Sequence, residues 1–147
     1  MKKIGILTCL NSNDVCTRAG CLSAFRERRD FFSGYPEDTI LAAVMTCNGC
    51  KETNAKEPAE DEGILEKADR LVSEKISVIH VGVCRLNEEK KECPRITQIC
   101  GLIEERGIKV IRGTHKEYEK PAVSFRKCRK YGDFFTECFC ENLCKFW

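Results

Sequence analysis

Four short apolar segments constrain the fold more than any other feature of this chain. They lie at residues 3–8, 39–46, 77–83 and 108–112, and each is apolar along most of its length rather than at alternate positions. Strands that are buried on both faces have this pattern, which is typical of a parallel sheet covered by helices. The segments therefore predict an α/β domain.

The stretches between these strands have helical periodicity. Residues 20–32, 61–75 and 94–106 carry apolar side chains at helical spacing, with Asp61 as the expected N-cap of the second helix and Gly107 ending the third. Strand and helix thus alternate along the chain, and right-handed crossovers leave few topologies for such an order. We expect a doubly wound, flavodoxin-like, parallel four-stranded sheet with helices on both faces.

The N-terminus and the charge bear on compartment and partners. Met1-Lys2-Lys3 leads directly into an apolar run that is too short for a signal peptide, and no segment approaches the ~20 apolar residues of a membrane span. We therefore expect a cytoplasmic protein without a membrane partner. The net charge of +2 gives no reason to expect a nucleic-acid partner.

The chain has 12 cysteines among its 147 residues. In a reducing compartment, clustered thiols more often bind metal or perform redox chemistry than form structural disulfides. Several lie where predicted strands end, and ligands of open α/β sheets bind beyond the carboxyl ends of the strands. The candidate metal ligands at this edge are Cys9, Cys16, Cys21, Cys47, Cys50, Cys84, Cys93 and His115.

Within this set, Cys47-Asn48-Gly49-Cys50 is the central motif. Two cysteines three positions apart can bind one tetrahedral ion from a tight turn, and Gly49 allows the backbone to bend. The same spacing also serves dithiol redox proteins. Cys9 and Cys84 end the first and third predicted strands, so we expect them beside this turn.

Two other positions have structural interpretations. Cys100 lies on the apolar face of the third predicted helix and is expected in the core, where free cysteine behaves as a small hydrophobe. His80 is in the middle of a strand and is expected to be a hydrogen-bonded core histidine. No glycine-rich phosphate loop is found. After the first predicted strand, Val15 stands six residues beyond Cys9 where a Cys-x5-Arg phosphatase loop needs arginine, and residues 10–14 lack the glycine expected of a flavin-phosphate loop.

The C-terminal part of the chain departs from the strand–helix alternation. We expect an α/β domain over residues 1–118 and a cysteine- and aromatic-rich extension over 119–147 that packs on the domain or on a partner. Seven of the twelve aromatic residues lie within 121–147. The extension has four cysteines, Cys128, Cys138, Cys140 and Cys144. They could form a second metal site, or they could form disulfides within the extension.

Taken in order, several motifs resemble the CGGC-domain family. They run from Lys3-Ile4-Gly5-Ile6 with Cys9, through Cys16 and Cys21, Cys47-x-Gly-Cys50, Ile79-His80-Val81-Gly82-Val83-Cys84 and Cys93-Pro94, to Gly113-Thr114-His115. The resemblance implies a metal-binding domain, in particular a zinc-binding one, and it implies a site rather than a reaction. Asn48 stands where the family motif has its first glycine, and asparagine tolerates the left-handed backbone that such a turn needs.

Three functional hypotheses follow. The first is a metal-binding protein that holds zinc or an iron–sulfur cluster (4Fe-4S) through cysteine thiolates, with redox, electron-transfer or sensing roles and a protein redox partner. Zinc is favoured by the resemblance and by the available histidine, and a cluster by the excess of cysteines. The second is a thiol oxidoreductase that uses Cys47 and Cys50. The third is a structural zinc module for protein interaction.

Overall fold

The computed structural model describes residues 1–50 and 55–116 and contains a four-stranded parallel sheet. The strand order is β2-β1-β3-β4, with all three strand pairs parallel. The predicted flavodoxin-like α/β fold is therefore confirmed, whereas the extension over 119–147 lies outside the described residues. The strands are β1 (Lys3–Thr8), β2 (Ile40–Thr46), β3 (Val78–Val81) and β4 (Lys109–Ile111).

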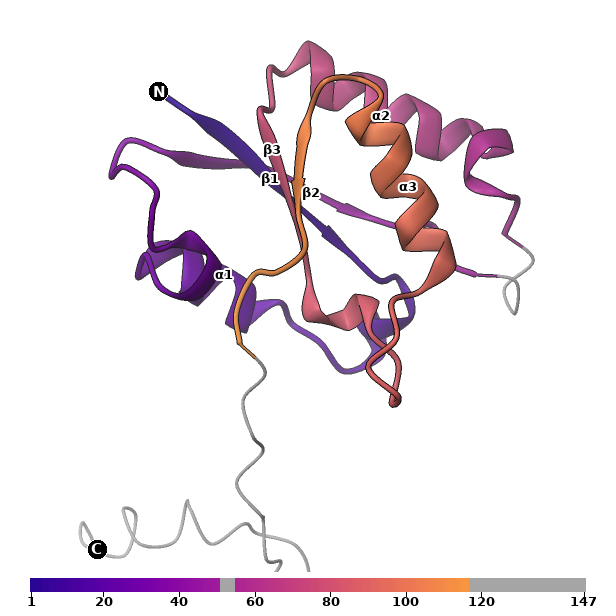
Figure 1. Ribbon diagram of the computed structural model, residues 1–147, viewed down its shortest axis with the longest axis horizontal. Coiled ribbons are helices and arrows are strands. Elements are labelled where there is room, and N and C mark those ends of the chain that lie inside the picture. Colours follow the sequence, from indigo (N-terminus) through magenta and orange to yellow (C-terminus); the bar gives the residue numbers. More distant parts are fainter. Residues whose placement is uncertain (51–54, 117–147) are drawn as a thin grey trace, which may run out of the picture. The chain divides into compact units, whose positions relative to one another are not determined.

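Three α-helices connect the strands and cover both faces of the sheet. Figure 1 shows α1 (Ala19–Arg26) on one side, and α2 (Glu62–Ser73) and α3 (Pro94–Glu104) together on the other. As expected, Asp61 is the N-cap of α2, and its side chain accepts a hydrogen bond from the Ile64 amide at 3.2 Å. Pro94 occupies the start of α3, where its missing N–H costs nothing.

The two faces of the sheet bury different kinds of side chain. On the α2–α3 face the core is mainly aliphatic, with Ile64, Ile79, Ile96 and Ile99 each fully buried. Cys100 belongs to this core, as its place on the apolar face of α3 predicts. The α1 face is centred on Phe32, whose ring lies 4.4 Å from the His80 ring and meets Phe25 edge to face.

Two predictions about the elements need correction. The helix predicted over 20–32 ends at Arg26 and is followed by a separate 3-10 turn at Asp30–Phe32, because Arg28 and Asp30 adopt left-handed backbone angles (φ 51° and 53°). The strand at β2 was expected to be buried on both faces, yet it is an edge strand with Val44 half exposed. Apolar content alone does not distinguish an edge strand from a central one.

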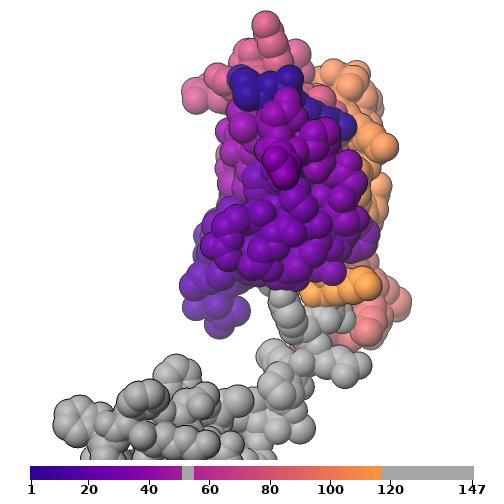
Figure 2. Space-filling view, turned by 90° about the vertical axis from the view of Figure 1, so that its left-hand side faces the viewer, coloured from indigo at the N-terminus to yellow at the C-terminus, as the bar shows by residue number. Residues whose placement is uncertain are grey.

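The face seen from the left of Figure 1 is formed mostly by the N-terminal segments, coloured indigo to purple in Figure 2, with β4 and its flanks at the margin. In the described part of the chain, no helix combines the length and the apolar character that crossing a membrane requires.

Candidate functional site

Three cysteines lie just beyond the carboxyl ends of the three neighbouring strands β2, β1 and β3. Cys47 follows β2, Cys9 follows β1, and Cys84 lies in the 3-10 turn Val83–Arg85 shortly after β3. Parallel pairing in register brings these ends to one edge of the sheet, as the sequence predicts. Cys9 and Cys84 thus lie one and three residues past their strands, rather than at their final positions.

Polar hydrogens are directed at the sulfur atoms of this edge. The Cys9 amide donates to Cys84 Sγ at 3.1 Å, and the Leu10 amide donates to Cys47 Sγ at 3.3 Å. The Asn11 side-chain amide donates to Cys50 Sγ at 3.2 Å. The segment that follows β1 therefore provides hydrogen-bond donors to the thiols of cysteines that follow β2 and β3. Hydrogen bonds of this kind stabilise a sulfur atom that carries negative charge.

The electrostatics of Cys9 support the same proximity. Burial raises the pKa of the Cys9 thiol, and the nearby charges that Cys47 and Cys84 would carry raise it further, while the Asn11 and Ser12 amides lower it. Negative charge on the neighbouring cysteines thus disfavours the ionised form of Cys9 unless a cation is bound. A bound metal ion supplies that positive charge and deprotonates coordinating thiols.

Close packing places the Cys84 sulfur over the backbone. A Cβ atom built on Gly82 would lie 3.1 Å from Cys84 Sγ, so the glycine leaves room for the sulfur to fold back toward β1. The Gly82 amide also donates to the Leu7 carbonyl at 2.9 Å, which continues the pairing of β3 with β1. Gly82 therefore helps to place the Cys84 sulfur next to the Cys9 amide.

The Cys47–Cys50 turn depends on two left-handed residues. Asn48 has φ 60° and Gly49 has φ 95°, so the chain reverses sharply between the two cysteines. Cys47 is 3 % exposed, whereas Cys50 is partly exposed. The asparagine at position 48 is compatible with the turn, as expected.

A lysine from α2 and an arginine from α3 donate hydrogen bonds to backbone carbonyl groups at the start of this turn. The Arg95 guanidinium donates from Nε to the Cys47 carbonyl at 2.8 Å and from Nη2 to Asp61 at 2.7 Å. The Lys67 ammonium donates to the Thr46 carbonyl at 3.2 Å and to the Asn48 side-chain oxygen. Sequence reasoning did not select Arg95 or Lys67, because each looks like an ordinary polar residue of an amphipathic helix.

A second group of candidate residues lies where α1 meets the segment after β4. Cys21, in the first turn of α1, is 4 % exposed, and its sulfur lies 3.3 Å from Thr114 Oγ1. The His115 ring lies over Gly20, where an added Cβ would come within 3.0 Å of Nε2. Burial raises the pKa of Cys21, and the charges of Cys84 and Cys16 raise it further. Negative charge on Cys84 thus raises the pKa of both Cys9 and Cys21.

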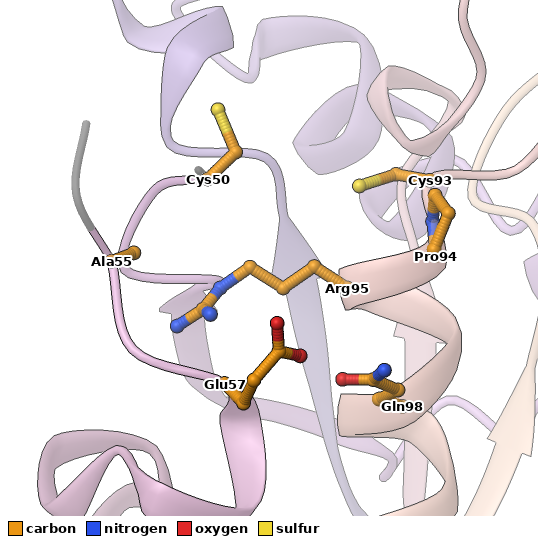
Figure 3. Close-up of a pocket in the computed structure, with 7 residues that line it drawn as sticks. All are labelled: Cys50, Ala55, Glu57, Cys93, Pro94, Arg95 and Gln98. Carbon is orange, nitrogen blue, oxygen red and sulfur yellow. The ribbon is translucent and has the colours of Figure 1, made fainter. Parts of the chain in front are cut away.

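A pocket of about 380 Å³ adjoins the Cys47–Cys50 turn at the start of α3. Cys50 and Cys93 line it, and the Arg95 side chain extends across it toward the segment of Ala55 and Glu57 (Figure 3). Cys93 is the N-cap residue of α3 and is partly exposed. The candidate ligands Cys50 and Cys93 thus share a cavity that is accessible from solvent.

The geometry brings Cys9, Cys47, Cys50 and Cys84 around the segment that follows β1 without closing a coordination sphere. Within residues 1–50 and 55–116, no three His, Cys, Asp or Glu side chains are close enough together to hold a metal ion as they stand. Cys128, Cys138, Cys140 and Cys144 lie outside the described residues. The donor chemistry nevertheless fits a soft metal, since thiolates are the ligands preferred by zinc and by iron–sulfur clusters.

His80 is a core residue, as predicted. It is fully buried, its Nδ1 lies 2.8 Å from the Gly113 carbonyl, and its Nε2 lies 2.8 Å from the Tyr35 hydroxyl. The carbonyl requires a proton on Nδ1, so Nε2 accepts from Tyr35. Both ring nitrogens are thereby satisfied, and the bond to Gly113 fixes the segment that carries Thr114 and His115.

Fold and site together define a parallel α/β domain with a thiol-rich carboxyl edge. The chain matches the CGGC domain over residues 3–115 and belongs to that family. The match covers the whole sheet and every candidate ligand except the four cysteines of the extension. Neither a curated protein nor a solved structure matches the chain.

Proposed function

We propose that this protein binds a soft metal centre through the thiolates of Cys9, Cys47, Cys50 and Cys84. One observation carries the proposal: amide hydrogens of the segment after β1 are directed at the sulfur atoms of cysteines that follow the two neighbouring strands. A cysteine that only fills space in a core needs no such donors, whereas a metal-bound thiolate is stabilised by them.

The donor set suits zinc and a 4Fe-4S cluster equally, since both accept four thiolates. Zinc bound in this way would stabilise the fold, and a cluster would provide one-electron redox chemistry for electron transfer or sensing. Cys16, Cys21, Cys93 and His115 are the further ligands available at the same edge. The residues of the chain contribute the thiolates, the amide donors to them, and the cations Lys67 and Arg95 that hold the turn.

A dithiol oxidoreductase that uses Cys47 and Cys50 is the alternative. Such enzymes lower the pKa of the attacking thiol with a helix N-terminus. Residues 47–50 are not themselves helical, and the start of α3 lines the same pocket as Cys50. The buried Cys47 is also the less accessible member of the pair, so the metal centre is the better supported proposal.

The test is metal analysis of the full chain purified without oxygen, together with its absorption spectrum. We expect stoichiometric zinc in a colourless protein, or iron and sulfide in a brown one. Cys47→Ala and Cys84→Ala should each lose most of the metal. Cys100→Ala is the matched control, because Cys100 is equally buried but lies in the aliphatic core, and it should keep the metal.

The opposite outcome is equally specific. A chain that stays metal-free after anaerobic addition of zinc, or of iron and sulfide, overturns the proposal. A reversible Cys47–Cys50 disulfide in the same preparation, mapped by mass spectrometry, would establish the dithiol alternative.

A further inference from the structure

The Cys47–Cys50 turn contacts α2. We propose that Asn48, Lys67 and Gly63 together hold the turn in the conformation that positions its two thiols for metal binding. These three residues are called the turn lock below. The inference rests on the proposed metal-binding function and deepens it, because it assigns positioning residues to that site.

Asn48 is the centre of the turn lock. Its backbone lies in the left-handed region, and its side-chain amide points to α2. The amide nitrogen lies 3.4 Å from Asp61 Oδ1, and the amide oxygen accepts from the Lys67 ammonium. A glycine at position 48 would permit the same backbone but would leave both partners without this contact. Asn48 therefore connects the turn to α2 as well as shaping it.

Lys67 joins the turn to the end of β2. Its ammonium group donates to the Thr46 carbonyl at 3.2 Å and lies 3.4 Å from Thr46 Oγ1, in addition to its bond with Asn48. An ammonium group has three hydrogens, so these three acceptors use its full donor capacity. Lys67 thus fixes the residue before Cys47 and the residue after it.

Gly63 provides the space in which the Asn48 amide sits. A Cβ atom at position 63 would lie 2.9 Å from Asn48 Nδ2 and 3.2 Å from Asp61 Oδ1. Glycine is a poor residue for the first turn of a helix such as α2. Its presence there is explained by the close approach of Asn48, which any side chain at this position would displace.

The opposite side of the turn is held by the chain after β1. Leu10 and Asn11 donate to the sulfur atoms of Cys47 and Cys50, while the turn lock holds the Thr46 carbonyl and the Asn48 side chain. Both sides of the turn are therefore fixed before a metal ion arrives. A preorganised site loses less conformational entropy on binding, so the turn lock should raise metal affinity.

Gly63→Ala tests the turn lock, and Gly101→Ala is its matched control. Both glycines lie in helices, but an added Cβ at Gly101 meets nothing within 4 Å. The readout is the rate at which a thiol reagent alkylates Cys47 and Cys50 in the reduced, chelator-treated full chain, resolved by mass spectrometry. Because alkylation of the buried Cys47 thiol follows the population of open turn, we expect Gly63→Ala to accelerate alkylation of Cys47 about tenfold. Gly101→Ala should leave it unchanged.

A double-mutant cycle gives a second measurement that does not depend on Gly63→Ala folding. Asn48→Gly and Lys67→Met should each accelerate alkylation about five- to tenfold, and the double variant should add little to either. Lys67→Arg should restore part of the protection, since it keeps a donor near Asn48. Zinc affinity should fall in the variants whose alkylation rates rise.

Equal alkylation rates in Gly63→Ala and Gly101→Ala would overturn the turn lock, and so would additive effects of Asn48→Gly and Lys67→Met. The labelling uses metal-free protein and is therefore independent of the proposed function. A chain that binds no metal but shows the expected labelling pattern would retain the turn lock and refute the metal centre.

Discussion

Cys47 and Cys100 are almost equally buried, at 3 % and 0 % exposure, yet they lie in two different environments. Cys47 stands at the carboxyl edge of the sheet, where the Leu10 amide donates to its sulfur and Arg95 donates to its carbonyl. Cys100 lies in the aliphatic core among α2 and α3, and burial raises the pKa of its thiol to about 11. Burial alone therefore does not distinguish the proposed metal ligand Cys47 from the core cysteine Cys100. The polar groups directed at the sulfur do.

The sharpest test of this comparison removes the cation that holds the edge. Arg95 and Asp61 form an ion pair with side chains only 9 % and 16 % exposed. Arg95→Met should lower the free energy of unfolding by about 3 kcal/mol, because it leaves Asp61 and the Cys47 carbonyl without this partner. Chemical denaturation of the metal-free chain measures the effect.

The matched control for Arg95 is Arg70, whose ion pair with Glu66 is mostly exposed, at 75 % and 64 %. Arg70→Met should change the free energy of unfolding by less than about 0.5 kcal/mol. If the two variants are equally stable, the carboxyl edge is not held by its polar contacts and the comparison between edge and core fails.

A second test concerns the histidine in the core. Burial lowers the pKa of His80, with smaller contributions in the same direction from Lys2 and Lys109. Well above the ordinary histidine pKa of about 6.5, the ring is neutral in the folded and the unfolded chain, so His80 makes stability independent of pH there. Below that value the unfolded chain binds a proton that the folded chain does not. Stability should then fall by up to about 1.4 kcal/mol per pH unit until the folded pKa is reached.

The measurement for His80 is denaturation between pH 7.5 and roughly pH 5. His80→Gln keeps a donor for the Gly113 carbonyl but does not titrate. Its free energy of unfolding should be lower than that of the wild type at pH 7.5 and should depend less on pH through this range. A wild-type curve as flat as that of the variant would mean that His80 is protonated without cost in the folded chain.

The smallest expected effect comes from replacing each of the two cysteines, Cys47 and Cys100, by serine and by alanine. At position 47, Ser can still accept from the Leu10 amide, so Cys47→Ser should be more stable than Cys47→Ala by about 1 kcal/mol. At position 100, Ser would bury a hydroxyl among aliphatic side chains, so the order should reverse by a similar amount. Metal-free protein is used in all four cases. The same order at both positions would contradict the distinction between edge and core.

Local patterns were sufficient to predict most of the fold. Asp61 caps α2 and Pro94 begins α3 as expected, because caps and helix starts depend on residues that are close together in sequence. The break after Arg26 and the exposure of β2 were missed. The first depends on left-handed residues with no glycine to signal them, and the second on strand order, which apolar content does not encode.

The sequence by itself determined the alternation of strands and helices and the placement of Cys9, Cys47 and Cys84 near the carboxyl ends of strands. The tertiary structure alone decided which atoms meet there: the Cys9 amide with the Cys84 sulfur, and Lys67 and Arg95 with the residues around the turn. The physical reason is the separation of the contacting residues along the chain. Periodicity records the burial of each element face, whereas these contacts join residues that are 19 to 75 positions apart. Their geometry exists only once the helices have packed on the sheet.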